Sequence, residues 1–454
     1  PPTPRRARAA AKTALDNPRA CERIPRMPVI RQLRAREILD SRGRPTVKTL
    51  CILASGAQAW ASVPSGASTG TAEARELRDG DPKRYRGLGC RQAVANVNGE
   101  LQHALAGTDW KSQADLDHAL LKLDKTRLGA NAVLSVSLAF ARACAAEAGT
   151  PLYRHLGPGT KLPQLTINLF SGGKHAGGQV QIQDVLVVPV AAKSVDEGLA
   201  MTFAVYQSAA ELIAEKYRMR TLRADEGGLA PPVADEEALL ADAVEAIRRA
   251  GYGPGREVAL AVDVASSHFY REGRYHLQSR QLSSRAMIEH LAGWLDRYPI
   301  ISLEDGLAEE DWEHWPVLRE RVAGRALVLG DDFLCTNPAR IRRAVAAGAA
   351  DALLLKVNQV GTLTEAAEAC RLAQEGEMVL ALEASELSWV VVQTDDASPH
   401  EALMRPGDRL MWKANEKFAL TVGNAGGIRG ELNGKPLAPF GPKGKVVRDI
   451  VVTR

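Results

Sequence analysis

The feature that most constrains this 454-residue chain is a series of short apolar segments that end in charged residues. The clearest segments span residues 258–265, 300–304, 326–331, 352–357 and 378–383. Their charges are Asp263, Glu304, Asp331, Lys356 and Glu383, at spacings of 41, 27, 25 and 27 residues. Such spacings are close to the roughly 30 residues per strand–helix unit of a ~250-residue β/α barrel. The pattern predicts an α/β architecture whose successive strand ends bring these charges to one face.

The preceding part of the chain has a different pattern. Residues 29–63 alternate short apolar runs with polar breaks, which predicts an antiparallel hairpin or meander. Apolar residues then recur at helical spacing in residues 72–78, 90–105, 113–123 and 132–148. A turn-rich stretch at Leu156–Gly159 indicates a domain boundary. We therefore predict a disordered basic leader at 1–27, an α+β cap domain at 28–157 and a β/α barrel catalytic domain at 158–454.

The charge distribution excludes some partners. Of the net +4 charge, much lies in the first 26 residues, and the remainder is close to neutral. This balance gives no reason to expect nucleic acid or an anionic membrane as a partner. The leader lacks the apolar run of a secretory signal, so a transit peptide, a disordered extension or a stretch before the initiator Met27 are the alternatives. We favour the last two.

Cysteine usage and hydropathy predict a cytoplasmic protein. The six cysteines are scattered and form no Cys-x-x-Cys pair, a usage typical of reduced packing residues. No run approaches the 18 apolar residues of a membrane span.

The charged strand ends suggest a metal site beside a base. Asp263, Glu304 and Asp331 offer hard oxygen ligands without histidine or cysteine, which favours Mg²⁺ over zinc. Lys356 follows on the next predicted strand, where a divalent cation and partial burial would lower its pKa towards that of a usable base. This combination suits removal of a proton α to a carboxylate, because the metal neutralises the charge that develops. The alternative is that Lys356 only neutralises neighbouring acids.

Seven segments, in order along the chain, resemble motifs of the enolase family. They are Ser41–Val47, Pro64–Gly70, Gly129–Ala132, Asp225–Gly228, Ser302–Asp305, Gly330–Asp332 and Leu355–Gly361. The resemblance covers about residues 28–375. It implies the enolase-superfamily fold, an eight-fold β/α barrel preceded by a smaller α+β cap, and it implies a hydro-lyase that uses Mg²⁺ at two sites. It also implies a homodimer or a ring of dimers.

The resemblance assigns roles to individual residues. Asp263, Glu304 and Asp331 match the ligands of the first Mg²⁺, and Ser68 matches a ligand of the second, substrate-dependent one. Lys356 matches the general base and Glu226 the acid that helps hydroxide to leave, with Asp184 and His175 beside them. Ser68, Arg42 and Gln183 match substrate-binding positions. Gly66 and Gly70 flank the loop of Ser68 and would let it close as a lid over the substrate.

The sequence also departs from the family pattern. The family pair Gln-Glu is Gln183-Asp184 here, one methylene shorter. After Lys356 the family carries Ser-His-Arg-Ser-Gly-Glu, whereas this chain has Ala381–Glu386, so Glu383, Ala384 and Ser385 would replace His, Arg and Ser. Between Arg371 and Arg405 there is no arginine or lysine. An arginine that grips the substrate phosphate is therefore missing from this segment, and Ser385 and Arg405 remain as substrate-binding candidates.

These observations predict a hydro-lyase with an unusual substrate. We expect it to eliminate water from a phosphorylated or phosphonylated hydroxy acid like 2-phosphoglycerate, giving an enolpyruvate product. An altered C2 phosphoryl group would make it similar to carboxyphosphonoenolpyruvate synthase of antibiotic pathways. The alternatives are an ordinary glycolytic enolase and a non-catalytic binding protein. A Rossmann dehydrogenase is disfavoured because no Gly-x-Gly-x-x-Gly turn follows an early strand. Muconate-type enzymes share the fold but not the loop at 65–70.

Overall fold

The computed structural model divides the chain into two compact units. It describes residues 28–66, 70–157, 162–218, 220, 222–375, 378–395, 397–414, 417–432 and 435–453. The predicted leader at 1–27 and the loop residue Ser68 lie outside the described residues. The first unit contains residues 28–39, 44–63 and 77–157. The second contains the described residues of 40–43, 64–76 and 162–453.

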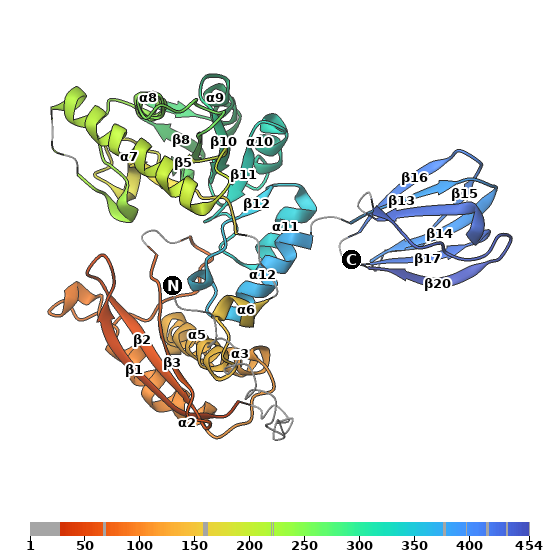
Figure 1. Cartoon of the computed structure of the whole chain (residues 1–454), viewed down its shortest axis with the longest axis horizontal. Coiled ribbons are helices and arrows are strands. Elements are labelled where there is room, and N and C mark those ends of the chain that lie inside the picture. The colour runs from red at the N-terminus through yellow and green to blue at the C-terminus, as the bar shows by residue number, and fades with distance from the viewer. Residues whose placement is uncertain are drawn as a thin grey trace, which may run out of the picture. The chain divides into compact units, whose positions relative to one another are not determined.

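The first unit packs a three-stranded sheet against a long helix (Figure 1). Strands β1 (Ile30–Leu39), β2 (Pro45–Leu53) and β3 (Gln58–Ser62) pair antiparallel in that order, as the alternating pattern predicted. Helix α5 (Ala130–Glu147) contacts β2 and β3, and its many alanines let it lie close to the sheet. The other helical segments are η1 (Tyr85–Gly87), α1 (Arg91–Asn96), η2 (Val97–Leu101), α2 (Gln102–Leu105), α3 (Gln113–Leu121), α4 (Lys125–Leu128) and α6 (Leu152–Leu156).

The helix predicted at residues 72–78 is wrong. This segment is non-helical, although its apolar spacing suits a helix. Its backbone bonds to distant partners instead, since Ala74 N donates to Gln359 O at 2.8 Å. Gly70, at the start of the segment, has no space for a side chain, because a Cβ there would lie 2.5 Å from Cys335 Sγ. Tertiary contacts therefore override the local helical preference.

The second unit contains a six-stranded sheet in the order β12-β11-β10-β6-β5-β4. Strands β4 (Ile167–Ser171) and β5 (Asp184–Val188) pair antiparallel, as do β5 and β6 (Ala259–Asp263). From β6 onward, β10 (Ile300–Glu304), β11 (Leu327–Gly330) and β12 (Ala352–Leu353) pair in parallel. The four predicted strands before residue 370 are thus present, although β12 has only two residues. A separate small sheet contains β7 (Tyr270–Arg271), β8 (Arg274–Leu277) and β9 (Arg280–Leu282).

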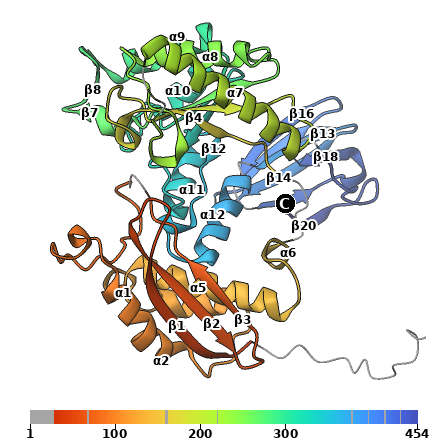
Figure 2. The same ribbon diagram turned by 60° about the vertical axis from the view of Figure 1, so that its left-hand side comes forward.

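Two helices follow β4 and β5, and from β6 onward helices alternate with the strands of the sheet (Figure 2). They are α7 (Val195–Tyr217), α8 (Glu236–Arg249), α9 (Ser284–Arg297), α10 (Trp315–Val322), α11 (Pro338–Ala347) and α12 (Leu363–Glu375). Short 3₁₀ turns are η3 (Gly173–His175), η4 (Asp225–Gly227), η5 (Ser266–Phe269) and η6 (Val357–Gln359). Several helices begin at a side chain that accepts a backbone N–H, as Ser194, Asp235, Ser283 and Asn337 do. These caps fix where each of these helices starts.

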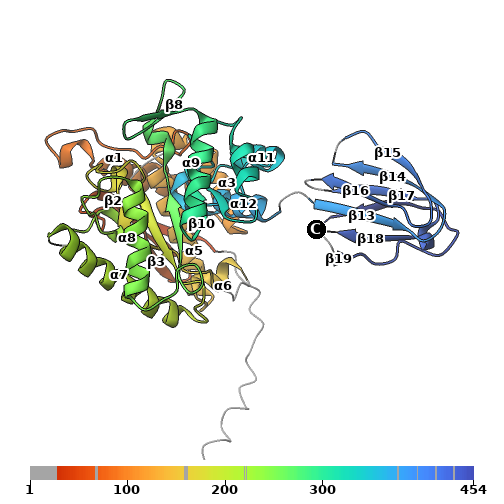
Figure 3. The same cartoon turned by 90° about the horizontal axis from the view of Figure 1, so that it is seen from above.

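Residues 378–452 do not continue the barrel sheet (Figure 3). They form two four-stranded sheets in the orders β16-β13-β18-β19 and β15-β14-β17-β20, with antiparallel pairing throughout. The strands are β13 (Met378–Ala384), β14 (Ser388–Thr394), β15 (His400–Met404), β16 (Arg409–Ala414), β17 (Phe418–Val422), β18 (Ile428–Leu432), β19 (Lys435–Pro436) and β20 (Val447–Val452), with η7 (Ala425–Gly427) between β17 and β18.

The prediction of a barrel that extends to residue 454 is therefore wrong beyond α12. In β13, Leu380, Leu382 and Ala384 are buried on one face, whereas on the other face Ala381 is buried but Glu383 is exposed, so that second face is only partly covered. That alternation is typical of an antiparallel strand with one solvent-facing side, whereas β6 is buried at every position. The two sheets have a hydrophobic core of their own, which includes Leu380, Val390 and Phe418.

Candidate active site

Strand register brings the predicted acids to one end of the sheet. Asp263 pairs with Asp184 on one side and with Glu304 on the other. Neighbouring strands lie about 4.8 Å apart, so these carboxylates are close neighbours. Leu329 pairs with Glu304, which places Asp331 two residues further along, just beyond β11.

A cavity of about 640 Å³ extends along the strands to this end of the sheet, and its lining includes the candidate residues. Its carboxylates are Asp184, Glu226, Asp263, Glu304 and Asp331, and its basic side chains are Lys356 and His175. With the histidine neutral, the lining carries five formal negative charges and one positive charge. The rest of the wall is largely apolar, with Leu186, Ile301, Leu327, Leu329 and Leu354. An enclosed surplus of negative charge of this size favours the binding of cations.

Burying several carboxylates together is unfavourable, and the pKa values of two of them are raised. Burial, followed by the charges of Asp184 and Asp331, raises the pKa of Asp263 to about 8. Burial and the carboxylates of Asp263 and Asp331 also raise the pKa of Glu304 well above its usual range. Without added positive charge, the cluster therefore holds protons near neutral pH.

Lys356 is tied to this cluster by an ion pair. Its Nζ donates to Asp331 Oδ2 at 2.5 Å. Burial lowers the pKa of Lys356, but the charge and hydrogen bond of Asp331 raise it more, and the net direction is upward. The predicted lowering of this pKa is therefore not produced by the protein groups alone. The carboxylates would first have to be neutralised by a bound cation.

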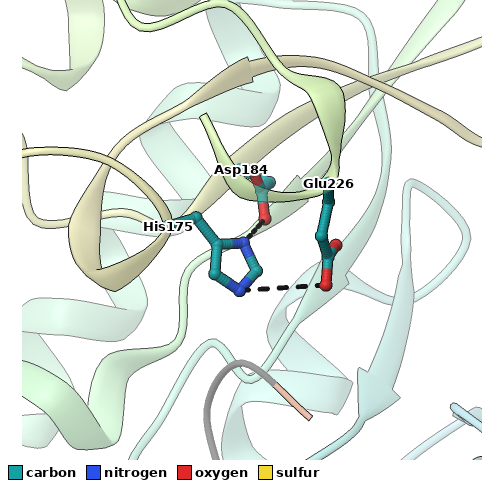
Figure 4. A group of neighbouring side chains, drawn as sticks. All are labelled: His175, Asp184 and Glu226. Atoms are coloured by element: carbon teal, nitrogen blue, oxygen red, sulfur yellow. Dashed lines mark hydrogen bonds and ion pairs between the residues drawn. The ribbon is translucent and has the colours of Figure 1, made fainter. Parts of the chain in front are cut away.

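On the other side of the cavity, Asp184, His175 and Glu226 form a chain of side chains (Figure 4). Asp184 Oδ2 lies 2.6 Å from His175 Nδ1, and His175 Nε2 lies 3.9 Å from Glu226 Oε1. Asp184 Oδ1 accepts from Asn168 Nδ2 at 2.6 Å and from Ser171 Oγ at 2.5 Å. Both oxygens of Asp184 are therefore engaged, and the shorter side chain orients His175, with Nε2 towards Glu226.

Glu226 lies in a turn whose backbone is strained. Its backbone has φ 64° and ψ 8°, in the left-handed region, and its side chain is 54% exposed. Such strain, of order 1–3 kcal/mol, persists where the surrounding structure imposes it and is concentrated at functional sites. Tyr206 OH donates to Gly227 O at 2.7 Å and holds the turn. Burial lowers the pKa of His175, but the Asp184 hydrogen bond and the nearby carboxylates raise it more, and the net direction is upward.

Arg42 and Gln183 also lie in this region of the second unit. Arg42 Nη1 is 3.8 Å from Asp225 Oδ2, and its Nη2 donates to Ser65 O. Gln183 lines the cavity, and its Nε2 donates to Asp263 Oδ2 at 2.8 Å. Gln183 Oε1 is buried with no hydrogen-bond partner among the described residues.

Ser385 and Arg405 belong to the antiparallel sheets rather than to a barrel strand. Ser385 N and Oγ both donate to Gly427 O, at 2.8 and 3.1 Å. Arg405 N donates to Asp408 Oδ2 at 2.8 Å in the turn between β15 and β16. The substrate-binding roles of Ser385 and Arg405 were assigned on the assumption that the barrel continues through this part of the chain. Because it does not, that alignment no longer supports the two roles. Ser68 lies outside the described residues.

Sequence reasoning missed the groups that orient this site. Asp305 is buried and accepts the backbone N–H of Asp331 at 3.0 Å and of Asp332 at 2.8 Å, so it anchors the loop after β11. Asn168 and Ser171, which position Asp184, lie outside the seven segments. Asp305 lies within one of them, so the signal for it was present in the sequence.

The residues at the strand ends fit Mg²⁺. Asp263, Glu304 and Asp331 provide hard oxygen donors, and their surplus negative charge is what a divalent cation balances. Gln183 Oε1, which has no hydrogen-bond partner among the residues that the structure describes, adds a buried oxygen beside Asp263. His175, Asp184 and Glu226 form a second group whose ligand atoms lie within 4.8 Å of one another. A metal there would have to displace the hydrogen bonds that Asp184 already makes.

Comparison with known families agrees with this geometry. A strand–helix sheet with a lysine and carboxylates at its strand ends, in a chain that also has a smaller α+β unit, is an arrangement typical of enzymes built on a TIM barrel. Residues 30–156 match the family model described as Enolase, N-terminal domain. Residues 160–385 match Enolase, C-terminal TIM barrel domain. The chain belongs to the enolase family, which supports an enolase-superfamily hydro-lyase in general, and this family typically uses Mg²⁺.

The last part of the chain matches a different family. Residues 381–451 match the RodZ C-terminal domain. This range coincides with the antiparallel sheets and supports the correction to the predicted barrel. In the part of the chain that the structure describes, no helix combines the length and apolar character needed to cross a membrane.

Proposed function

We propose that the chain is a Mg²⁺-dependent hydro-lyase that removes the proton α to a carboxylate and eliminates water from the adjacent carbon. The observation that carries this proposal is the cavity, which is lined by Lys356 beside Asp331 and by His175 beside Glu226. One group can take a proton and the other can give one, both within the same enclosed space.

The reaction divides between these groups. The C–H bond next to the substrate carboxylate breaks, its proton passes to Lys356 Nζ, and the electron pair moves into the carboxylate. The C–O bond of the neighbouring hydroxyl then breaks as Glu226 gives that oxygen a proton, and the electron pair returns to form the C=C bond. Water and an enol product result. His175, oriented by Asp184, has its Nε2 3.9 Å from Glu226 Oε1 and so helps to orient the Glu226 side chain.

Lys356 can act only when it is neutral. Its raised pKa shows that the carboxylates around it stabilise the ammonium form. Divalent cations held by Asp263, Glu304 and Asp331 would supply the positive charge that lowers this pKa and balances the charge developing on the substrate carboxylate.

The cavity also supports an altered substituent at C2 of the substrate. Among the described residues that line it, Lys356 is the one lysine and no arginine is present. A phosphate is usually gripped by arginine, so we propose a 2-phosphoglycerate-like substrate with a modified phosphoryl group, as in a carboxyphosphonoenolpyruvate synthase. We further propose a cytoplasmic homodimer or higher homo-oligomer with no nucleic-acid or membrane partner.

A second candidate function is non-catalytic metal-dependent binding. The observation that favours it is that the described barrel sheet has six strands in linear order, with β4 and β12 at its edges. The chain then continues into the two antiparallel sheets instead of further strand–helix units.

The deciding experiment measures elimination directly. Purified protein with MgCl₂ is mixed with 2-phosphoglycerate and then with carboxyphosphono-substituted glycerate, and the enol product is followed by ultraviolet absorbance. We expect turnover with the second substrate, lost in Lys356→Ala. A matched control is Lys443→Ala, whose lysine pairs with Glu386 in the antiparallel sheets. Turnover of 2-phosphoglycerate alone would favour an ordinary enolase. Mg²⁺ binding without turnover of either substrate would favour the binding protein.

A further inference from the structure

Two buried side chains without a role so far, Thr336 and Gln359, connect the proposed base Lys356 to the proposed metal ligand Asp331. Thr336 is 0% exposed and Gln359 is 1% exposed. Gln359 Nε2 donates to Asp331 Oδ1 at 2.7 Å, and Gln359 Oε1 accepts from Thr336 Oγ1 at 2.7 Å. Thr336 Oγ1 in turn accepts from Lys356 N at 2.9 Å. With the bond from Lys356 Nζ to Asp331 Oδ2, the four residues close a ring of hydrogen bonds.

The contacts of the ring favour one arrangement of its protons. The backbone N–H of Lys356 can only donate, so the threonine hydroxyl accepts it. The hydroxyl then donates its single proton to Gln359 Oε1 at 2.7 Å rather than to Leu354 O, which lies 3.5 Å away. The glutamine then presents Nε2 to Asp331, whose Oδ1 accepts at 2.7 Å. Its amide also lies 3.4 Å from Glu73 Oε1 in the segment at 70–76. The orientation of the Gln359 amide therefore follows from its partners, and each oxygen of Asp331 has its own donor.

The backbone around Thr336 is strained in a way that this ring explains. Cys335 has φ 49° and Thr336 has φ 51°, both in the left-handed region. A β-branched residue there is a genuine outlier, and such strain persists only where the surroundings impose it. Cys335 N donates a hydrogen bond to Asp331 O at 2.7 Å, which turns the chain back towards the end of β11. This turn brings the threonine hydroxyl within reach of Lys356 N.

We propose that Thr336 and Gln359 are positioning residues that hold Asp331 and Lys356 in the geometry required for Mg²⁺ binding and proton removal. The inference rests on the metal site of the proposed function, but not on its substrate or turnover. Groups that orient metal ligands typically change metal affinity by 10–100-fold when they are removed. A ligand that is free to rotate has to be ordered again when the cation binds, which weakens binding.

The test uses the full chain and MgCl₂ alone, with binding measured by isothermal titration calorimetry. Thr336→Val removes the hydroxyl but keeps the β-branch, so the backbone strain is unchanged. Gln359→Met removes the amide at similar volume. We expect each variant to weaken Mg²⁺ binding by about 10–100-fold. Thr336→Ser retains the hydroxyl, and we expect its affinity to stay within about threefold of the parent. Because both residues act through one ring, the double variant should be less than additive.

A second measurement separates positioning from simple structural support. Thermal unfolding in EDTA reports stability of the metal-free protein. Lower melting temperatures for Thr336→Val and Gln359→Met with unchanged Mg²⁺ affinity would overturn the proposal, as would a parent chain that binds no Mg²⁺. Weakened affinity restored by Thr336→Ser would support it. Absence of turnover with intact Mg²⁺ binding would count against the proposed function and leave this inference standing.

Discussion

The binding of Mg²⁺ should compete with protons at Asp263. Burial and the charges of Asp184 and Asp331 raise the pKa of this carboxyl from its ordinary 3.8 to about 8. A cation requires the ionised form, so binding has to displace the proton. Raising the pH from 6 to 8 is therefore the perturbation that tests the electrostatics of the site.

The expected magnitude follows from that pKa. With a pKa of about 8, roughly one Asp263 carboxyl in a hundred is ionised at pH 6 and about half are ionised at pH 8. The apparent Mg²⁺ affinity should rise about 50-fold, or ~2.3 kcal/mol at 1.36 kcal/mol per tenfold change. Glu304, whose pKa burial also raises, adds to this trend in the same direction.

The assay is calorimetric titration with MgCl₂ at pH 6, 7 and 8, repeated in buffers of different ionisation enthalpy to count the protons released. We expect Asp263 to release about one proton per Mg²⁺ at pH 6, falling towards half a proton at pH 8, and Glu304 adds to this release. Glu313→Gln is the matched control, since it removes an exposed carboxylate without touching the cavity and should leave the pH dependence unchanged. Affinity that is constant from pH 6 to 8 with no proton release would refute the reasoning.

The raised pKa of Asp263 also makes the stability of the metal-free protein depend on pH. Because the folded-state pKa of Asp263 lies above its ordinary value of 3.8, the folded chain binds the extra proton. This contribution to stability is complete below the unfolded-state pKa and is lost as the pH rises towards about 8. Mg²⁺ should therefore stabilise the protein more at pH 8 than at pH 6.

Three further predictions concern neighbouring groups. Asp305→Ala leaves buried backbone N–H groups unpaired and should destabilise the fold by about 2–5 kcal/mol, measured by urea unfolding, while Asp305→Asn should cost less. Asp184→Asn removes the charge that raises the His175 pKa, so this pKa should fall, as NMR titration of the imidazole would show; an unchanged value would contradict the orienting role. Ser385→Ala and Arg405→Ala should leave the KM for the substrate unchanged in the elimination assay, because both residues lie in the antiparallel-sheet region, and a raised KM would restore their predicted role in substrate binding.

The sequence by itself was enough to predict which end of the barrel sheet carries the candidate catalytic and metal-binding residues. The charges at Asp263, Glu304, Asp331 and Lys356 could be located because each ends an apolar segment, and strands of a β/α sheet end at a common face. The meander in the first unit was also predictable, since its apolar and polar residues alternate with the period of a strand.

Only the tertiary structure decided where the barrel sheet ends. An apolar run such as residues 378–384 predicts a strand, but its pairing partners decide whether that strand lies in a parallel or an antiparallel sheet. Here β16 and β18 pair with it in antiparallel register, and both follow it in the sequence. The alignment that placed Ser385 at a phosphate-binding position assumed that this segment pairs with a barrel strand. The local apolar pattern does not specify the pairing partner.

The tertiary structure also decided how the site residues are oriented. Asp184 could be recognised as a shortened carboxylate, but its hydrogen bonds with Asn168 and Ser171 arise only when β4 and β5 pair. Similarly, the ring through Thr336 and Gln359 requires a left-handed backbone at a threonine, a conformation that sequence propensity disfavours. Local sequence sets which groups are present near a strand end, whereas long-range pairing and imposed strain set the direction in which they point.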